Sequence, residues 1–367
     1  MIKIYLDQKD YIRIAHGLLG DSTCQTDVEV YNYLLNLITE NRIQIYYSWC
    51  HFKEAAAFSY HDINYLDKFI DVVLSLANSN CVKDHPELTK IEIELLLGPK
   101  FNFSADSDSQ YPFGKKSDVA LSKIDENFEE VLFGRKFSDN EKKDIKRKMN
   151  RKNTSDLRNL VPCTRQFARK EIVLLFAGQN SQQRFEIVRK CLDIMFNIRF
   201  FLKNLSSLKP IQDFIDLKNR KADEMIDVIL AYKTERYKGK NGLSETDVIE
   251  FIRKATVKSF ENHVRNLATK HKFSTDEAVH FIIDNISKIH SINSYIQIFS
   301  EYLKRHKGTR NPTRNDYMDI HHMRYLPYVD YFITDRFFAE VAKGISGIFN
   351  TKVVRNLDEL KTHLIEL

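Results

Sequence analysis

The fold of this chain is decided by residues 315–338, which read NDYMDIHHMRYLPYVDYFITDRFF. A helix-compatible segment comes first and carries Asp316 and Asp319. A run of β-forming residues, 331–334, then stops at Asp335. Open α/β sheets bind their ligands at the carboxyl ends of the strands, where the loops diverge and leave a crevice. The stretch therefore predicts a strand of an α/β sheet whose carboxyl end carries an acid.

The start and the end of the chain repeat this order of strand, acid and helix. A β-rich run over residues 3–6 ends at Asp7, and a second run over residues 43–47 leads into a helix that carries Glu54. After the stretch quoted above come a helix, a strand over residues 351–354 and a final helix. Strands that alternate with helices predict βαβ units and a parallel sheet. We therefore expect an α/β fold that is built from both ends of the chain.

The middle of the chain has apolar residues at three- and four-residue steps and almost no strand signal. We expect residues 1–62 and 310–367 to form one discontinuous α/β domain, and residues 63–309 to form an all-helical insertion. Residues 135–152 of this insertion are rich in lysine and arginine. A basic run is usually a solvated helix face, although phosphate contacts need this kind of patch. The candidate nucleic-acid patch consists of Lys142, Lys143, Lys146, Arg147, Lys148, Arg151 and Lys152.

Composition excludes several classes of protein. The chain has 367 residues, of which 43% are hydrophobic and 29% charged, and this balance is typical of a globular rather than a disordered chain. The five cysteines are scattered and include no Cys-x-x-Cys pair, which argues against a disulfide framework and a zinc site. No apolar stretch is long enough to span a bilayer, and the start lacks the pattern of a signal peptide. We therefore expect a cytoplasmic protein with no membrane partner.

Five acids are predicted to lie at strand ends and helix starts of one sheet. They are Asp7, Glu54, Asp316, Asp319 and Asp335. Hard cations such as Mg²⁺ and Mn²⁺ prefer oxygen ligands, and such a metal activates water and offsets charge in phosphodiester hydrolysis. Any one of these acids alone would be better explained as a helix cap or a surface residue. Because five of them converge on one predicted sheet edge, we expect a metal site.

Three segments of the chain match motifs of a known family. Residues 4–12 resemble the first motif of the PIN-domain nuclease superfamily, a hydrophobic strand that ends in an acid. Residues 46–54 are similar to the second motif, in which a serine or threonine precedes the helix that bears a glutamate. Residues 331–338 are similar to the closing motif of strand, threonine, acid, basic residue and phenylalanine. The resemblance implies a three-layer α/β/α fold with a parallel sheet, and acids that bind Mg²⁺ or Mn²⁺ to hydrolyse phosphodiesters, most often in RNA.

The resemblance also implies roles for the acids. Metal ligands are expected at Asp7, Glu54, Asp319 and Asp335, while Asp316 competes with Asp319 for the third position or adds a fifth acid. Weaker candidates can orient a carboxylate or a water, or contact a phosphate, although capping, packing and charge neutralisation are competing explanations. These weaker candidates are Ser48, His51, Asp330, Thr334 and Arg336. His321 and His322 also lie close to the acids in sequence, and each is more simply explained as a buried or surface histidine.

The main hypothesis from sequence is therefore a metal-dependent endoribonuclease, with RNA favoured over DNA as the partner. The net charge of +6 permits a polyanionic partner without requiring one. One alternative is a PIN-like fold kept as a binding or scaffolding module that uses the helical insertion. Another is a DNA nuclease or phosphatase with the same metals. A role as a toxin or in defence follows only by analogy with the family, and the sequence leaves the oligomeric state open, homodimer included.

Overall fold

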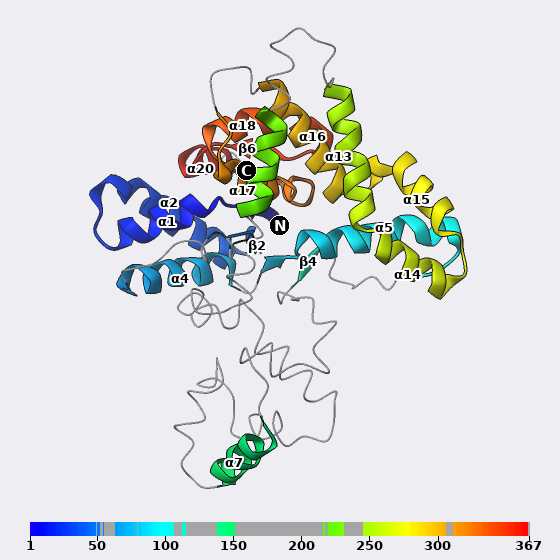
Figure 1. The fold of residues 1–367 in the computed structure, drawn as a ribbon. Helices are drawn as coiled ribbons and strands as arrows, with labels where there is room; N and C mark the ends of the chain where they lie inside the picture. The colour runs from blue at the N-terminus through cyan, green and yellow to red at the C-terminus, as the bar shows by residue number, and fades with distance from the viewer. Residues whose placement is uncertain are drawn as a thin grey trace.

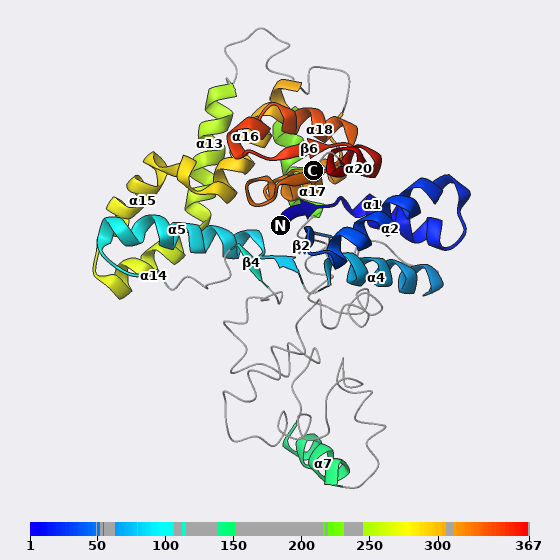
Figure 2. The same ribbon diagram turned by 180° about the vertical axis from the view of Figure 1, so that it is seen from behind.

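Figure 1 shows the computed structural model of the chain, and Figure 2 shows it from behind. The structure describes residues 1–48, 50–51, 54, 63–78, 80–105, 112–114, 138–150, 216, 219–230, 245–305 and 311–365. One sheet and the helices around it account for most of these residues. None of the helices in these ranges is both long and apolar enough to cross a membrane.

The sheet has six strands in the order β4-β3-β2-β1-β5-β6. Their bounds are β1 Ile2–Tyr5, β2 Ile43–Ser48, β3 Cys81–Val82, β4 Phe113–Gly114, β5 Tyr331–Ile333 and β6 Lys352–Val354. Neighbouring strands are parallel except for β4, which is antiparallel to β3. The chain runs outward from β1 to β2 and β3, and later returns to the other side of β1 with β5 and β6. The topological switch point therefore lies between β1 and β5, where open α/β sheets bind their ligands.

Two apolar clusters cover the sheet, because alternate residues of a strand point to opposite faces. Ile4 and Leu6 belong to one cluster, whereas Tyr5 and Phe332 belong to the other. The first cluster includes residues of α1 (Gln8–Leu18), α2 (Gln25–Thr39), α4 (Ile63–Ala77) and α20 (Leu357–Ile365). The second includes residues of α16 (His290–Arg305), α17 (Arg314–Met323) and α18 (Arg336–Lys343). The sheet is thus packed with helices on both faces, which leaves its strand ends as the place for polar side chains.

A third apolar cluster lies in the helical region, against the N-terminal half of α16. It joins Ile292 and Ile296 of α16 to residues of five other helices or turns. These are α5 (His85–Phe101), α13 (Glu245–Ser259), α14 (Glu261–His271), α15 (Thr275–Asp284) and η3 (Ile286–Lys288). The remaining elements are η1 (Ser22–Cys24), α7 (Asp139–Asn150), η4 (Leu326–Tyr328), α19 (Ser346–Phe349) and a helix over residues 219–230. Helix α16 therefore connects the sheet core to the helical region.

The predicted α/β class with a mainly parallel sheet is confirmed, and one expectation about the middle of the chain is corrected. Strands β3 and β4 come from residues 63–309, which were expected to be all-helical, and they extend the sheet beyond β2. Helix α4, from the same range, packs against α1 and β2. Each of these strands has only two residues, and so short a segment shows no periodicity in sequence.

Candidate acidic site at the strand ends

Asp7 and Asp335 hold equivalent places on either side of the switch point. Asp7 follows β1 and caps α1, where its Oδ1 accepts a hydrogen bond from the backbone N–H of Lys9 at 3.2 Å. Asp335 follows β5 and caps α18, where its Oδ1 accepts from the N–H of Phe338 at 2.8 Å. The capping interpretation therefore holds for both acids, and the helix N-termini stabilise their negative charge. Capping does not exclude a second role, because it uses one oxygen of each carboxylate.

Asp319 is the acid that the others surround. It lies three residues after Asp316 on α17, so both side chains share one face of that helix. Burial raises the pKa of Asp319 well above its ordinary value, and the negative charges of Asp7, Glu54, Asp335 and Asp316 raise it further, in that order. All five acids that the sequence singled out thus interact electrostatically at one edge of the sheet. A bound cation would offset the negative charges that raise this pKa.

Asp316 and Asp319 have different roles, although they were alternatives in sequence. Asp316 is fully buried and accepts hydrogen bonds from the hydroxyl of Tyr302 at 2.7 Å and from the hydroxyl of Thr313 at 2.8 Å. It also completes a capping box with Thr313 at the start of α17. Asp319 accepts no hydrogen bond from the part of the chain that the structure describes. Asp316 therefore holds the helix in place, and Asp319 is the one left to meet a ligand.

Asp10 joins the acids although sequence reasoning did not select it. It is buried on α1, and its Oδ2 accepts a hydrogen bond from the backbone N–H of Asp7 at 3.1 Å. Burial, followed by the charge of Asp7, raises the pKa of Asp10 to about 8. Burial also raises the pKa of Asp7, against the lowering effects of Lys9 and His322. The spacing of Asp7 and Asp10 is that of a capping box, and this is the sequence signal from which the pair could have been found.

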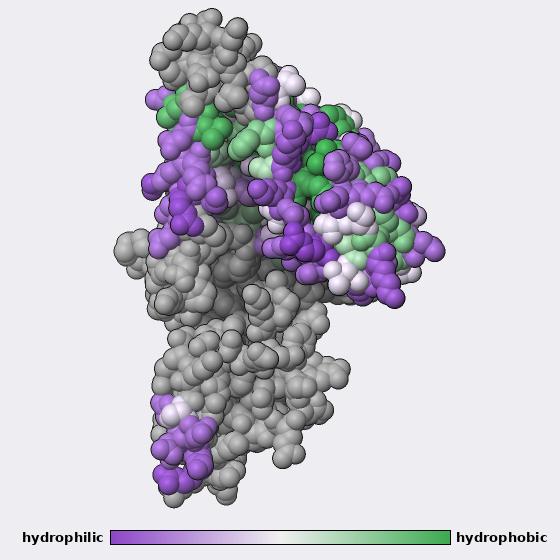
Figure 3. Space-filling view, turned by 45° about the vertical axis from the view of Figure 1, so that its right-hand side comes forward, coloured by the Kyte–Doolittle hydropathy of each residue, from purple (hydrophilic) through white to green (hydrophobic). Residues whose placement is uncertain are grey.

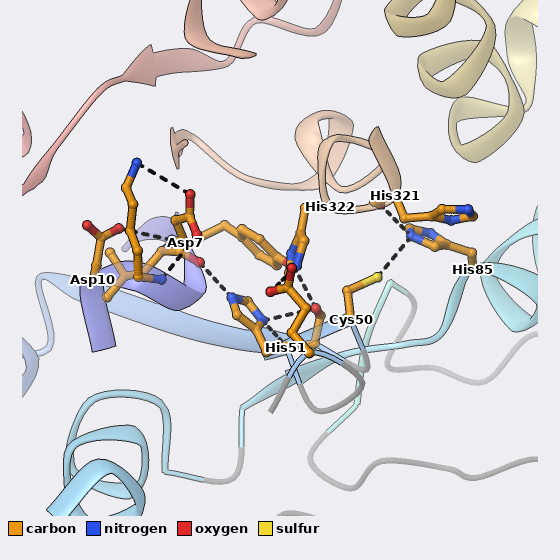
Figure 4. A network of polar contacts seen from close by, with 12 residues as sticks. Asp7, Asp10, Cys50, His51, His85, His321 and His322 are labelled. Carbon is orange, nitrogen blue, oxygen red and sulfur yellow. Dashed lines mark hydrogen bonds and ion pairs between the residues drawn. The ribbon is translucent and has the colours of Figure 1, made fainter. Parts of the chain in front are cut away.

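His51 and Ser48 are buried parts of the support beneath the acids (Figure 4). The Nε2 of His51 lies 2.7 Å from the carbonyl oxygen of Leu6, and because a carbonyl only accepts, this nitrogen carries the proton. The Nδ1 of His51 then accepts from the backbone N–H of Ser48 at 3.0 Å. Burial lowers the pKa of His51 well below its ordinary value, so the ring stays neutral. His51 therefore braces the backbone before Asp7 rather than facing a substrate.

Glu54 is held by two residues that the sequence did not connect with it. The Nε2 of His322 lies 3.0 Å from Oε2 of Glu54, and the Nδ1 of the same ring lies 2.6 Å from the hydroxyl of Tyr5. The hydroxyl of Tyr5 also bonds to Oγ of Ser48. Figure 4 shows His322 and His51 side by side, with ring centroids 4.8 Å apart. No sequence signal marked Tyr5, except that it lies two residues before Asp7 and so on the same face of the strand.

The remaining weak candidates, Asp330, Thr334 and Arg336, lie at different positions relative to the acids. Asp330 precedes β5, and its Oδ2 accepts from the backbone N–H of Lys3 at 2.7 Å, which places it at the amino ends of the strands. It therefore belongs to the edge opposite the acids and is not part of their cluster. Thr334 is buried between β5 and Asp335, and its backbone N–H donates to the carbonyl oxygen of Val354 in β6 at 3.2 Å. Arg336 is exposed at the first position of α18, beside the acids.

The candidate nucleic-acid patch is described only in part. Three of its residues, Lys142, Lys146 and Lys148, lie on α7 but their side chains fall outside the described residues, as do Arg151 and Lys152 entirely. Lys143 and Arg147 are exposed, and Arg147 pairs with Asp144 at 3.3 Å. Figure 1 shows α7 apart from the sheet, and in Figure 3 its surface is hydrophilic. The structure therefore shows a solvated face on α7 and does not bring it to the acids.

The described residues contain no ready-made metal-binding group. Among the described residues, no three His, Cys, Asp or Glu side chains are arranged so that they could hold a metal ion. The carboxylates are bonded instead to helix N-termini and to His322. The chemistry of the donors nevertheless fits Mg²⁺ or Mn²⁺, because all four expected ligands are carboxylates and hard cations prefer oxygen. The electrostatic repulsion around Asp319 is the kind that a bound cation relieves.

Comparisons with family models, curated proteins and solved structures gave no match to this chain. Its function is therefore inferred from the acidic site itself.

Proposed function

We propose that the chain is a metal-dependent nuclease with a PIN-like three-layer α/β/α fold and that its substrate is RNA. The observation that carries the proposal is the set of acids around Asp319 at the switch point of the sheet. Buried carboxylates that repel one another destabilise a fold unless a cation offsets their charge. A protein used only for binding has no reason to keep such a set together.

Each acid has a place in this proposal. Asp7, Glu54, Asp319 and Asp335 would hold the Mg²⁺ or Mn²⁺, and Asp316 would keep α17 in position. When bound, such a metal lowers the pKa of a water molecule and offsets the charge that develops on the phosphate. Asp319, whose pKa is raised, would give up its proton on binding.

Two basic residues next to the acids are suited to contact the substrate. Lys9 lies 3.5 Å from Oδ2 of Asp7 and is 37% exposed, so a metal that binds Asp7 would release its ammonium group. Arg336 is exposed directly after Asp335. A guanidinium and an ammonium group both bind phosphate, so these two side chains would hold the backbone of the nucleic acid across the switch point.

RNA is proposed rather than DNA because of the resemblance to PIN-domain nucleases, and the net charge of +6 is compatible with either polyanion. The test is to incubate the purified protein and Mn²⁺ with labelled single-stranded RNA and with DNA of the same sequence. Cleavage of RNA should stop with EDTA and with either Asp319→Asn or Asp335→Asn. Asp330→Asn is the matched control, because it removes the same charge at the opposite edge and should leave cleavage intact.

The outcomes separate the alternatives. Cleavage that persists in both Asp319→Asn and Asp335→Asn would contradict the proposed site. Cleavage of DNA but not RNA would identify a DNA nuclease, and neither cleavage nor Mn²⁺ binding would identify a binding module with this fold.

A further inference from the structure

A continuous chain of hydrogen bonds runs beneath the acids and joins the segments that carry them. Starting from the carbonyl of Leu6, it passes through His51, Ser48 and Tyr5 to His322 and ends at Glu54. Except for Glu54 at the end of the chain, every residue whose side chain takes part is buried. Figure 4 shows this network from close by.

The network is linked to the segments that carry three of the four expected ligands. Leu6 is the residue directly before Asp7, so its carbonyl fixes the backbone at the end of β1. Glu54 is itself the last member of the chain. His322 lies three residues after Asp319, on the same face of α17. One network therefore sets how three acid-bearing segments sit relative to one another.

The proton count fixes which group orients Glu54. A phenol has one proton to donate, and the hydroxyl of Tyr5 lies between Oγ of Ser48 and Nδ1 of His322. Tyr5 either donates this proton to Nδ1 of His322 or receives one from it. An ionised carboxylate only accepts, so Nε2 of His322 donates to Glu54, 3.0 Å away, and in the neutral ring Nδ1 then accepts from the hydroxyl of Tyr5. Tyr5 therefore fixes the ring, and the ring fixes the carboxylate.

We propose that Tyr5 and His322 are positioning residues that hold Glu54 in the orientation in which it binds the metal. The inference rests on the proposed function, and it adds two residues to the proposed site. Outer partners of this kind orient metal ligands, and their loss typically weakens metal binding by about 10- to 100-fold. Tyr5 is suited to this part because its ring is itself fixed by stacking on Phe332, with centroids 5.0 Å apart and planes at 4°.

The test measures Mn²⁺ affinity by isothermal titration calorimetry in the full chain, together with the melting temperature in EDTA. Tyr5→Phe removes only the hydroxyl and keeps the stacked ring. His322→Phe keeps the volume of a ring and removes both nitrogens. The matched control is Tyr328→Phe, because the hydroxyl of Tyr328 is buried and donates to a carboxylate, Glu92, at 2.6 Å in another part of the molecule.

Tyr5→Phe and His322→Phe should each weaken Mn²⁺ binding by about tenfold or more. Tyr328→Phe should lower the melting temperature and leave Mn²⁺ affinity unchanged. If His322→Phe does not fold, Tyr5→Phe decides the matter alone.

Wild-type affinity in Tyr5→Phe would overturn this inference while the proposed function stands. An equal loss of affinity in Tyr328→Phe would also overturn it, because the loss would then come from lower stability of the whole protein and not from the orientation of Glu54. Absence of Mn²⁺ binding by the wild-type protein would overturn the proposed function and this inference together.

Discussion

The pH dependence of stability in the metal-free protein should be governed in large part by Asp10. The pKa of this buried acid is raised from 3.8 to about 8, first by burial and then by the charge of Asp7. The folded protein therefore holds a proton that the unfolded chain releases. The stability from this group is fully present below about pH 4 and is lost as the pH rises through about 8. Asp10→Asn removes the titration but keeps an oxygen that accepts from the N–H of Asp7.

The size of the effect follows from the two pKa values. One pKa unit corresponds to about 1.4 kcal/mol, so the free energy of unfolding of Asp10→Asn should gain about 4 kcal/mol on that of the wild type between pH 5 and pH 8. Urea unfolding followed by circular dichroism, in EDTA at several pH values, measures this difference. Asp358→Asn removes an exposed acid and controls for the loss of one charge. Parallel pH profiles for Asp10→Asn and the wild type would refute the reasoning.

Further predictions concern the metal and the helix starts. Asp319→Asn should abolish the rise in melting temperature with Mn²⁺, which in the wild type is worth about 2.7 kcal/mol at a hundredfold excess over Kd. Mn²⁺ affinity, measured by calorimetry, should increase by about tenfold per pH unit while Asp319 still holds its proton, because binding needs the carboxylate; a flat profile would contradict the raised pKa. Thr313→Ala should cost about 1 kcal/mol in urea unfolding, since it removes the cap of α17 and a partner of Asp316. Gly17→Ala should cost about 1–3 kcal/mol, because a Cβ there would lie 2.6 Å from the carbonyl of Cys24, and an unchanged midpoint would show that the loop yields.

The strand ends were predictable from the sequence because their signals are local. A β-type run that stops at an acid and continues as a helix describes both Asp7 and Asp335, and the structure has both as caps after parallel strands. The choice between Asp316 and Asp319 was not predictable. It depends on the hydroxyl of Tyr302, which donates a hydrogen bond to Asp316 from a different helix. The residue spacing around Asp316 does not indicate this contact.

Features that depend on long-range contacts were not predictable, because the signals in a sequence are local. The two-residue strands β3 and β4 are stabilised by pairing with the rest of the sheet and have no period of their own. Tyr5 and His322 are 317 positions apart, and each has an ordinary explanation as a buried aromatic residue. Their connection appears only when the parallel pairing of β1 with β5 brings the two ends of the chain together.

The way each acid is held decides how it should respond to a cation. Asp7 and Asp335 each have one oxygen bonded to a backbone N–H at a helix N-terminus, which fixes the direction of the side chain. Glu54 is bonded to His322, which fixes its direction. Asp319 has no such partner among the described residues, and burial together with the neighbouring acids raises its pKa well above the ordinary value. A cation that enters would therefore find three oriented side chains and one acid whose pKa is raised well above the ordinary value. The release of the proton from Asp319 is then the step that links metal binding, pH and the stability of the strand ends.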